Sequence, residues 1–488
     1  MPPLYPFHSL TFGSLIDISY LCVTLNLEIM LQNTTPERVA SIIKSQRSHF
    51  ASHSTLDIEY RLEALRRLRA AILKYEQPLC EALYVDLHKS YEEAYLTEIS
   101  IVLGEIDNFL KSLKGWAAPS HKSTPIKMFP SRSEILTEPL GMVLIIAPWN
   151  YPVQLLLNPL VGAIGAGCTA VLKPSPYTPN VAKVLQTLIE ECFSEEYVAV
   201  VQGNRDVNTE LLKHRYDLIF FTGSPSLARV VMRAAAENLT PVVLELGGKS
   251  PVVVDRSADI DIAARRVAWG KSLNAGQTCI APDYLLIHKD IKEPFIEAFR
   301  RAMLKLYGSD VRGSKHYGRM VTDAAFERVS SYIAEGVVRC GGTINRAERY
   351  IEPTLLDNVA ADSRVMTDEI FGPILPMIEI ESIDEAIAFI NRREKPLAMY
   401  VFAEESEARR VFNLTSSGGG CINDTIMHIA NEHLPFGGVG NSGMGRYHGR
   451  DSLYAFSHRR SVVTTSTKID LPFRYMPYKL FRWVKRLL

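Results

Sequence analysis

Short, uninterrupted apolar runs that alternate with segments of helical periodicity dominate the sequence from residue 141 onward. Such runs are typical of strands buried on both faces, and their separation by roughly 10–20 helical residues indicates βαβ units. The predicted strands are Gly141–Ile146, Thr169–Leu172, Val198–Val201, Leu218–Phe221, Val242–Leu244 and Pro251–Val254. The pattern therefore predicts an α/β fold with a doubly wound parallel sheet.

A second alternating set begins at Tyr284–Ile287 and continues to Cys421–Asn423. The 488 residues are enough for two or three packed units. We therefore expect two α/β domains. No internal repeat or low-complexity tract interrupts them.

Helical patterns precede the strands. Thr35, followed by proline and glutamate, is a predicted helix cap. Leu62, Leu65 and Leu68 recur at helical spacing with arginines between them, which predicts an amphipathic helix. The segment Ala117–Arg132 is rich in Pro, Ser and Lys, and we expect it to leave the first domain.

Charge and cysteine usage exclude several function classes. Lys plus Arg equals Asp plus Glu, at 54 each, so no overall field favours nucleic acid. The seven cysteines are scattered, with no CxxC pair, which argues against a disulfide scaffold and a metal site. We expect a cytoplasmic protein in a reducing compartment.

The first 29 residues differ from the rest. They have no basic region at the start, and Asp17 interrupts their apolar stretch, so neither a signal peptide nor a membrane span is favoured. We expect Met30 to be the natural start and the preceding residues to be upstream translation or a loosely ordered extension.

The usual dinucleotide fingerprint GxGxxG is absent. Gly162–Gly167 and Gly440–Gly445 have the reversed spacing, which is more typical of helix packing or a turn. A better phosphate site is the predicted strand end at Gly223 and Ser224, because a helix that begins there would present free N–H groups and a positive dipole end.

Six motifs occur in an order and spacing that closely resemble the aldehyde dehydrogenase superfamily, over Thr35 to Ser466, and the tail resembles its class 3 branch. The motifs are Pro148–Pro152, Lys173–Ser175, Phe221–Ser224, Glu245–Lys249, Gly276–Cys279 and Glu369–Pro373, and the tail segments are Leu434–Gly438 and Gly445–Gly449. The resemblance implies oxidation of an aldehyde to a carboxylic acid with a nicotinamide dinucleotide.

Three residues are the candidates for catalysis. A lone cysteine such as Cys279 is usually an inert buried residue, but the resemblance makes it the nucleophile, which forms a thiohemiacetal and then a thioester. Asn150 could cap a helix that starts near Pro152; by resemblance its amide donates to the oxyanion together with the backbone N–H of Cys279.

Glu245 ends an apolar strand just before a Gly-Gly pair. Desolvation there would raise its pKa, which suits a general base that activates water against the thioester. A surface ion pair with Lys249 is the alternative.

The resemblance also implies a cofactor site. Lys173 and Glu369 would bind the two riboses, and Phe371 would position the nicotinamide ribose. Gly223 and Ser224 would face the pyrophosphate, and near the nicotinamide the contacts would come from Trp149 and Leu246.

Two departures from the family pattern concern this site. Ala228 replaces a second glycine of the phosphate loop, which weakens that assignment. Pro176 replaces a glutamate that would bind the 2′-hydroxyl and repel a 2′-phosphate, so we expect NAD to work and NADP to be tolerated.

By resemblance we expect a cofactor domain over 30–116 and 138–246, a catalytic domain over 247–417, and a bridging or oligomerisation part over 117–137 and 418–488. Class 3 members are dimers, which predicts a homodimer. The basic end Tyr478–Leu488 could lie on an anionic membrane surface, but docking on the enzyme's own subunit or over the substrate entrance is favoured.

Two other functions remain open. One is an acylating reductase with the same cysteine chemistry, which has less need for a base such as Glu245. The other is an inactive dinucleotide-binding protein, against which the presence of Cys279, Asn150 and Glu245 argues.

Overall fold

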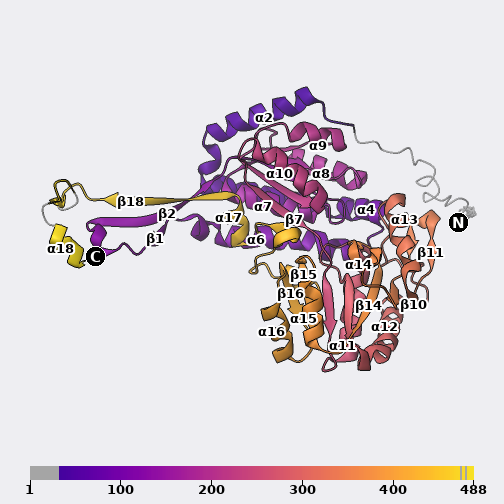
Figure 1. Ribbon diagram of the computed structural model, residues 1–488. Helices are drawn as coiled ribbons and strands as arrows, with labels where there is room; N and C mark the ends of the chain where they lie inside the picture. Colours follow the sequence, from indigo (N-terminus) through magenta and orange to yellow (C-terminus); the bar gives the residue numbers. More distant parts are fainter. Residues whose placement is uncertain (1–31, 473–474, 479–480, 488) are drawn as a thin grey trace, which may run out of the picture.

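The computed structural model describes residues 32–472, 475–478 and 481–487. Figure 1 shows a body built from two α/β units and a long arm that projects from it. The predicted α/β class is confirmed. The segment 1–29 lies outside the described residues.

The first unit contains a sheet of six strands in the order β17-β7-β6-β3-β4-β5, counted within the described chain. Its strands are β3 (Met142–Ile146), β4 (Thr169–Lys173), β5 (Val198–Val200), β6 (Leu218–Gly223), β7 (Val242–Leu246) and β17 (Gly443–Met444). All neighbours are parallel except β17, which pairs antiparallel with β7. The five parallel strands lie within two residues of predicted runs, whereas β17 matches none of them and the predicted run Pro251–Val254 belongs to the other sheet.

Helices cover both faces of this sheet. They are α2 (Pro36–Ala51), α3 (Ile58–Lys74), α4 (Glu76–Leu87), α5 (Tyr91–Ala94), α6 (Ser100–Ala117), α7 (Gln154–Ala166), α8 (Pro179–Cys192), α9 (Arg205–Leu211) and α10 (Pro225–Ala236). Alternate residues of β3 enter different clusters: Val143 packs with the residues of α3, α6 and α7, whereas Leu144 packs with those of α2 and α10. This double burial explains the unbroken apolar runs.

The predicted local signals are found at the expected places. Thr35 caps α2, since its side chain accepts a hydrogen bond from the N–H of Arg38 at 3.3 Å. Gly162 lies in α7 against Phe456, and Gly440–Ser442 form a short helical turn, so neither glycine segment is a phosphate loop.

The second unit has a sheet of seven strands in the order β10-β13-β14-β9-β8-β15-β16 among the residues that the structure describes. They are β8 (Pro251–Val254), β9 (Tyr284–His288), β10 (Val337–Cys340), β13 (Thr354–Asp357), β14 (Ile374–Ile380), β15 (Ala398–Phe402) and β16 (Gly419–Ile422). The accompanying helices are α11 (Ile260–Ser272), α12 (Lys292–Tyr307), α13 (Asp323–Ser331), α14 (Arg364–Thr367), α15 (Ile383–Asn391) and α16 (Glu405–Leu414), and a small hairpin joins β11 (Ile344–Asn345) to β12 (Tyr350–Ile351).

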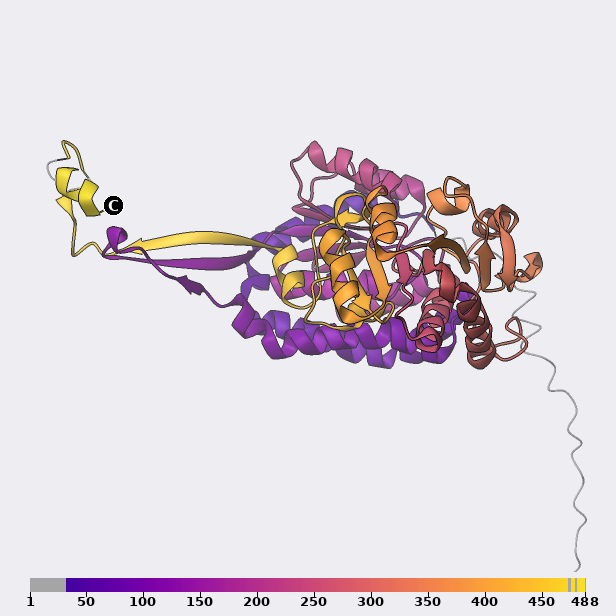
Figure 2. The same cartoon turned by 60° about the horizontal axis from the view of Figure 1, so that its bottom comes forward.

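The arm is a sheet made of β1 (Ser120–Lys122), β2 (Ser131–Pro139) and β18 (Ser457–Thr465), which follows α17 (Arg450–Ala455). Both views show it extending away from the body (Figures 1 and 2). Two strands do not follow the expected domain boundaries. The arm strand β2 continues past residue 137, and β16 lies beyond residue 417 although it is the edge strand of the second sheet.

The helix α18 (Phe481–Leu487) lies at the tip of the arm, away from the body (Figure 1). Within this single chain it therefore does not cover an entrance in the body, contrary to the favoured expectation. None of the helices in the described ranges is long and apolar enough to cross a membrane.

Candidate active site

The carboxyl ends of β3, β4, β6 and β7 lie along one edge of the first sheet, because these strands are parallel. Strand order reverses between β3 and β6, and ligands of such sheets bind at this switch point. The strand ends carry most of the predicted cofactor residues. Trp149 follows β3, Lys173 ends β4, Gly223 ends β6 and Leu246 ends β7.

Lys173 and Ser224 differ in their surroundings. Lys173 is buried, its Nζ donates to the carbonyl oxygen of Pro174 at 2.7 Å, and burial lowers its pKa to about 8. Ser224 is exposed and caps α10, with its Oγ accepting from the N–H of Leu227 at 3.4 Å. Ala228 is buried in the first turn of this helix. The start of α10 thus faces the sheet edge with a capped, positive end.

Glu369 and Phe371 come from the loop between α14 and β14 and reach the same edge. A side chain at Gly247 would collide with the carboxyl group of Glu369, so the glycine makes room for it. Burial raises the pKa of Glu369 to about 7, and the charge of Asp283 adds to the rise. The Phe371 ring lies edge-on to Trp149, with centroids 5.4 Å apart.

Three side chains hold this loop by its backbone; we call them the loop clamp. Lys249 forms an ion pair with Asp283 and donates to the carbonyl oxygen of Asp368 at 2.8 Å. Asp283 accepts from the N–H of Ile370 at 3.0 Å. Arg328 donates to the carbonyl oxygen of Ile370 at 2.9 Å. The alternative ion pair of Lys249 with Glu245 is therefore wrong.

Cys279 lies between a buried turn and β9. In that turn Asn274 and Ala275 have left-handed backbones, with φ of 50° and 52°. The side chain of Gln277 donates to the carbonyl oxygens of Asn274 and Arg319, at 3.0 and 2.9 Å, and accepts from the N–H of Val321 at 3.0 Å. The glutamine before the cysteine thus fixes the turn.

Asn150 points at this turn. Its side chain is 2% exposed, and Nδ2 donates to the carbonyl oxygen of Gln277 at 3.0 Å. The helix α7 is capped by another group, because Glu98 accepts from the N–H groups of Val153 and Gln154 at 2.8 and 3.3 Å. The helix-cap interpretation of Asn150 is therefore wrong.

A buried ion pair lies behind Asn150. Lys89 and Glu98 are fully buried and 2.6 Å apart, and Lys89 also donates to the carbonyl oxygen of Asn150 at 2.8 Å. Sequence reasoning missed this pair, since a lysine and a glutamate nine residues apart give no signal of their own.

Glu245 is 2% exposed, and neither carboxyl oxygen has a hydrogen-bond partner within the described chain. Burial raises its pKa well above the ordinary value, against the opposing charge of Arg446. An unpaired buried carboxyl group is costly, which is typical of a functional group.

The pKa of Cys279 is raised to about 12, mainly by burial and in smaller part by the charges of Glu369 and Glu245. The thiol is therefore protonated in this state. A proton acceptor or a positive charge must be present when the thiol reacts.

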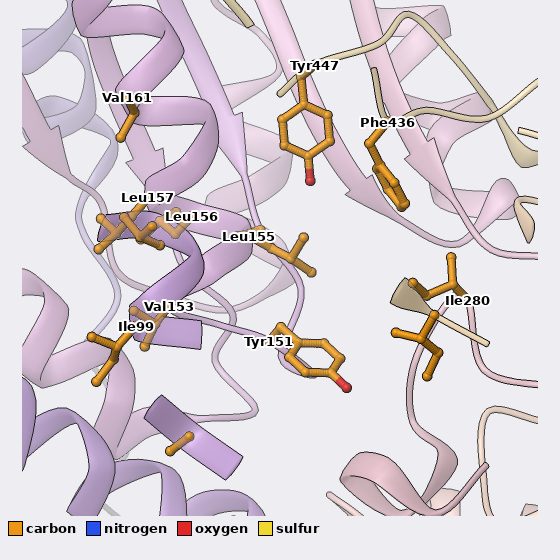
Figure 3. Close-up of a cluster of buried hydrophobic side chains, with 14 of the residues drawn as sticks. Ile99, Tyr151, Val153, Leu155, Leu156, Leu157, Val161, Ile280, Phe436 and Tyr447 are labelled. Carbon is orange, nitrogen blue, oxygen red and sulfur yellow. The ribbon is translucent and has the colours of Figure 1, made fainter. Parts of the chain in front are cut away.

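A cavity of about 380 Å³ opens onto Cys279. Figure 3 shows Tyr151, Leu155, Ile280 and Phe436 turned toward one another there. The lining side chains are Leu96, Thr97, Ile101, Tyr151, Gln154, Leu155, Trp269, Leu273, Thr278, Cys279, Ile280, Ile426, Met427, Ile429, Ala430 and Phe436. They come from separate segments, so no sequence pattern could identify them together.

The sheet edge fits a dinucleotide. Lys173 is a buried cation at a strand end, and Glu369 is a half-buried carboxyl group from the facing loop, for which Gly247 leaves room. No group of His, Cys, Asp or Glu within the described residues could hold a metal ion.

Comparisons with known proteins agree with this geometry. The aldehyde dehydrogenase family model matches residues 27–462. The chain is 48% identical over 443 residues to the 4,4'-diaponeurosporen-aldehyde dehydrogenase of Staphylococcus aureus, which covers 90% of this chain and 96% of that one. It is 43% identical over 447 residues to the dimeric NADP-preferring aldehyde dehydrogenase of Canis lupus familiaris, with 90% and 98% covered. A substrate-bound structure of Staphylococcus aureus AldH superposes with a TM-score of 0.90 at 47% identity, over 92% of this chain and 99% of that one.

Proposed function

Because this chain belongs to the aldehyde dehydrogenase family and is an oxidoreductase that oxidises aldehydes, we propose that it acts through a thioester on Cys279. The observation that carries the proposal is the meeting of three features at one point. Cys279 opens onto an apolar cavity, the Asn150 amide points at the turn before it, and the unpaired carboxyl group of Glu245, when ionised, contributes to the raised pKa of the thiol.

In the first half-reaction the sulfur of Cys279 adds to the aldehyde carbon, and its proton passes to a base. The alkoxide that forms is stabilised by Nδ2 of Asn150 and the backbone N–H of Cys279. The alkoxide expels its hydride, for which a nicotinamide dinucleotide bound at the sheet edge would supply the acceptor. The product on Cys279 is a thioester.

In the second half-reaction Glu245 takes a proton from water, and the resulting hydroxide attacks the thioester carbon. The C–S bond breaks, the acid leaves, and the sulfur regains a proton. The two oxygens of Glu245 are free to accept this proton, since no described side chain or backbone group occupies them.

For the cofactor we propose that NAD works and NADP is tolerated. Pro176 supports this, because it lies half-buried in the turn directly after β4 and brings no negative charge near a 2′-phosphate. The canine relative is named as NADP-preferring. Lys173, Glu369, Phe371, Trp149, Leu246, Gly223 and Ser224 would hold the dinucleotide.

For the substrate we propose medium-to-long aliphatic or aromatic aldehydes. The largely apolar lining of the cavity supports this class, because burial of a hydrocarbon chain there is favourable. The Staphylococcus aureus relative is named for 4,4'-diaponeurosporen-aldehyde.

The test follows reduced-nicotinamide absorbance with either dinucleotide and a series of aldehydes of increasing chain length. Activity should rise with chain length and vanish in Cys279→Ala, which should still bind dinucleotide. Asn150→Ala removes one oxyanion donor and should lower turnover roughly a hundred- to thousandfold. A preference for short, charged semialdehydes would overturn the substrate class.

The acyl acceptor distinguishes an acylating reductase of the same fold from the proposed dehydrogenase. Turnover that depends on added phosphate or coenzyme A would favour the reductase and contradict hydrolysis by Glu245.

A further inference from the structure

The cavity beside Cys279 is apolar apart from a few polar side chains in its wall. Besides the cysteine, these side chains are Thr97, Tyr151, Gln154 and Thr278, and the indole of Trp269 adds one N–H donor. Their hydrogen bonds decide what a bound chain must supply, because a polar group left unpaired in an apolar cavity weakens binding.

The three hydroxyl groups already have partners in the protein. Thr97 donates to the carbonyl oxygen of Glu93 at 2.7 Å. Tyr151 and Thr278 share a hydrogen bond of 2.6 Å. Each of these hydroxyls therefore has at least one partner within the protein.

Gln154 differs from them. It is 3% exposed, and its Nε2 has no hydrogen-bond partner within the described residues. Its backbone is fixed, since the N–H donates to Glu98 at the start of α7. The last torsion of a glutamine is broad and roughly two-fold, so a half-turn can present the amide nitrogen to the cavity.

We infer that Gln154 selects aldehydes that carry an oxygen acceptor, such as an ether, keto or hydroxyl oxygen, on the chain behind the aldehyde group. A hydrocarbon chain of the same length leaves the buried amide unpaired, whereas the oxygen satisfies it. The hydrocarbon is disfavoured because it leaves a buried polar group of the protein unpaired. The inference rests on the proposed function, since the cavity is taken to hold the aldehyde.

The experiment compares straight-chain aldehydes with analogues in which one methylene is replaced by oxygen, with the oxygen moved one position at a time. The kcat/KM of each analogue is divided by that of the parent aldehyde. In the wild-type enzyme one oxygen position should give a maximum of this ratio. In Gln154→Met, which keeps the size and loses the N–H groups, the ratio at that position should fall about tenfold.

Thr97→Val is the matched control. It removes a polar group from the same wall whose hydrogen bond is internal, so it should leave the position of the maximum and its height unchanged. A flat ratio in the wild type overturns the inference, whether or not the variants fold. An equal maximum in Gln154→Met also overturns it. If the wild type oxidises no aldehyde at all, the proposed function fails instead.

Discussion

Glu245 carries a buried carboxyl group that the proposed chemistry needs as a base. In Glu245→Gln the size and shape of the side chain persist, but the group cannot take a proton. Hydride transfer should survive, and steady-state turnover should fall roughly a hundredfold or more. Rapid mixing should show one burst of reduced cofactor per active site, and mass spectrometry should detect the acyl group on Cys279. Undiminished turnover at neutral pH would show that Glu245 is not the base.

The same carboxyl group predicts a pH dependence of stability. Burial raises its folded pKa above the unfolded value, so the folded protein favours the neutral form. The contribution of Glu245 protonation to the free energy of unfolding is complete below the unfolded pKa and is lost as pH rises through the folded pKa. The difference in Tm between Glu245→Gln and the wild type should therefore shift in favour of the variant as pH rises from about 4.5 upward. A constant difference would contradict the burial of an unpaired carboxyl group.

Pro176 is predicted to permit NADP. Pro176→Glu places a carboxylate in the turn after β4, where it should repel a 2′-phosphate and lower the kcat/KM for NADP about tenfold more than that for NAD. Pro176→Gln is the control, since it has the same size without the charge. An equal loss with both cofactors would show that this position does not contact the 2′ group.

At the scale of elements, the strands of the first sheet could be predicted because they are buried on both faces. Val143 and Leu144 enter different clusters, which requires an apolar residue at every position of β3. The arm gave a weaker signal. Most side chains of β2 are only half-buried and those of β18 are mostly exposed, so neither strand shows a continuous apolar run.

The loop clamp could not be predicted, because Lys249, Asp283 and Arg328 come from three separate segments. The motif Gly276–Cys279 could be identified from the sequence, but the role of Gln277 in fixing the turn depends on partners as distant as Arg319. The unpaired amide of Gln154 is likewise visible only when its neighbours are known.

Arg328 tests whether the clamp positions the cofactor loop. Arg328→Ala removes the donor to two successive carbonyl oxygens, those of Glu369 and Ile370. The loss should raise the KM for dinucleotide roughly fivefold, corresponding to about 1 kcal/mol, with little change in the KM for aldehyde. Arg346→Ala is the control, because it breaks an exposed ion pair with Glu327, the residue before Arg328. It should leave the KM for dinucleotide and the KM for aldehyde unchanged. Parallel increases in both would indicate general damage to the fold.

For the whole molecule we predict a homodimer. The arm projects from the body with its faces largely open, and the canine relative is named as dimeric. Sedimentation velocity should give a single species of twice the chain mass. Truncation after residue 456 removes β18 and should yield a monomer, provided that circular dichroism shows a folded body. A monomer or a tetramer of the full chain would refute the prediction.

The pairing of β2 with β18 also has a consequence during synthesis, because the two strands are made far apart in time. The hydrogen bond between Ser131 and Thr465 joins residues 334 positions apart. At about 5–20 residues per second, the ribosome completes β18 roughly 20 to 70 seconds after β2. Throughout this interval the edge of β2 that later binds β18 remains open on the nascent chain, as a template for strand addition. The interval should therefore be the time when the chain most needs a chaperone.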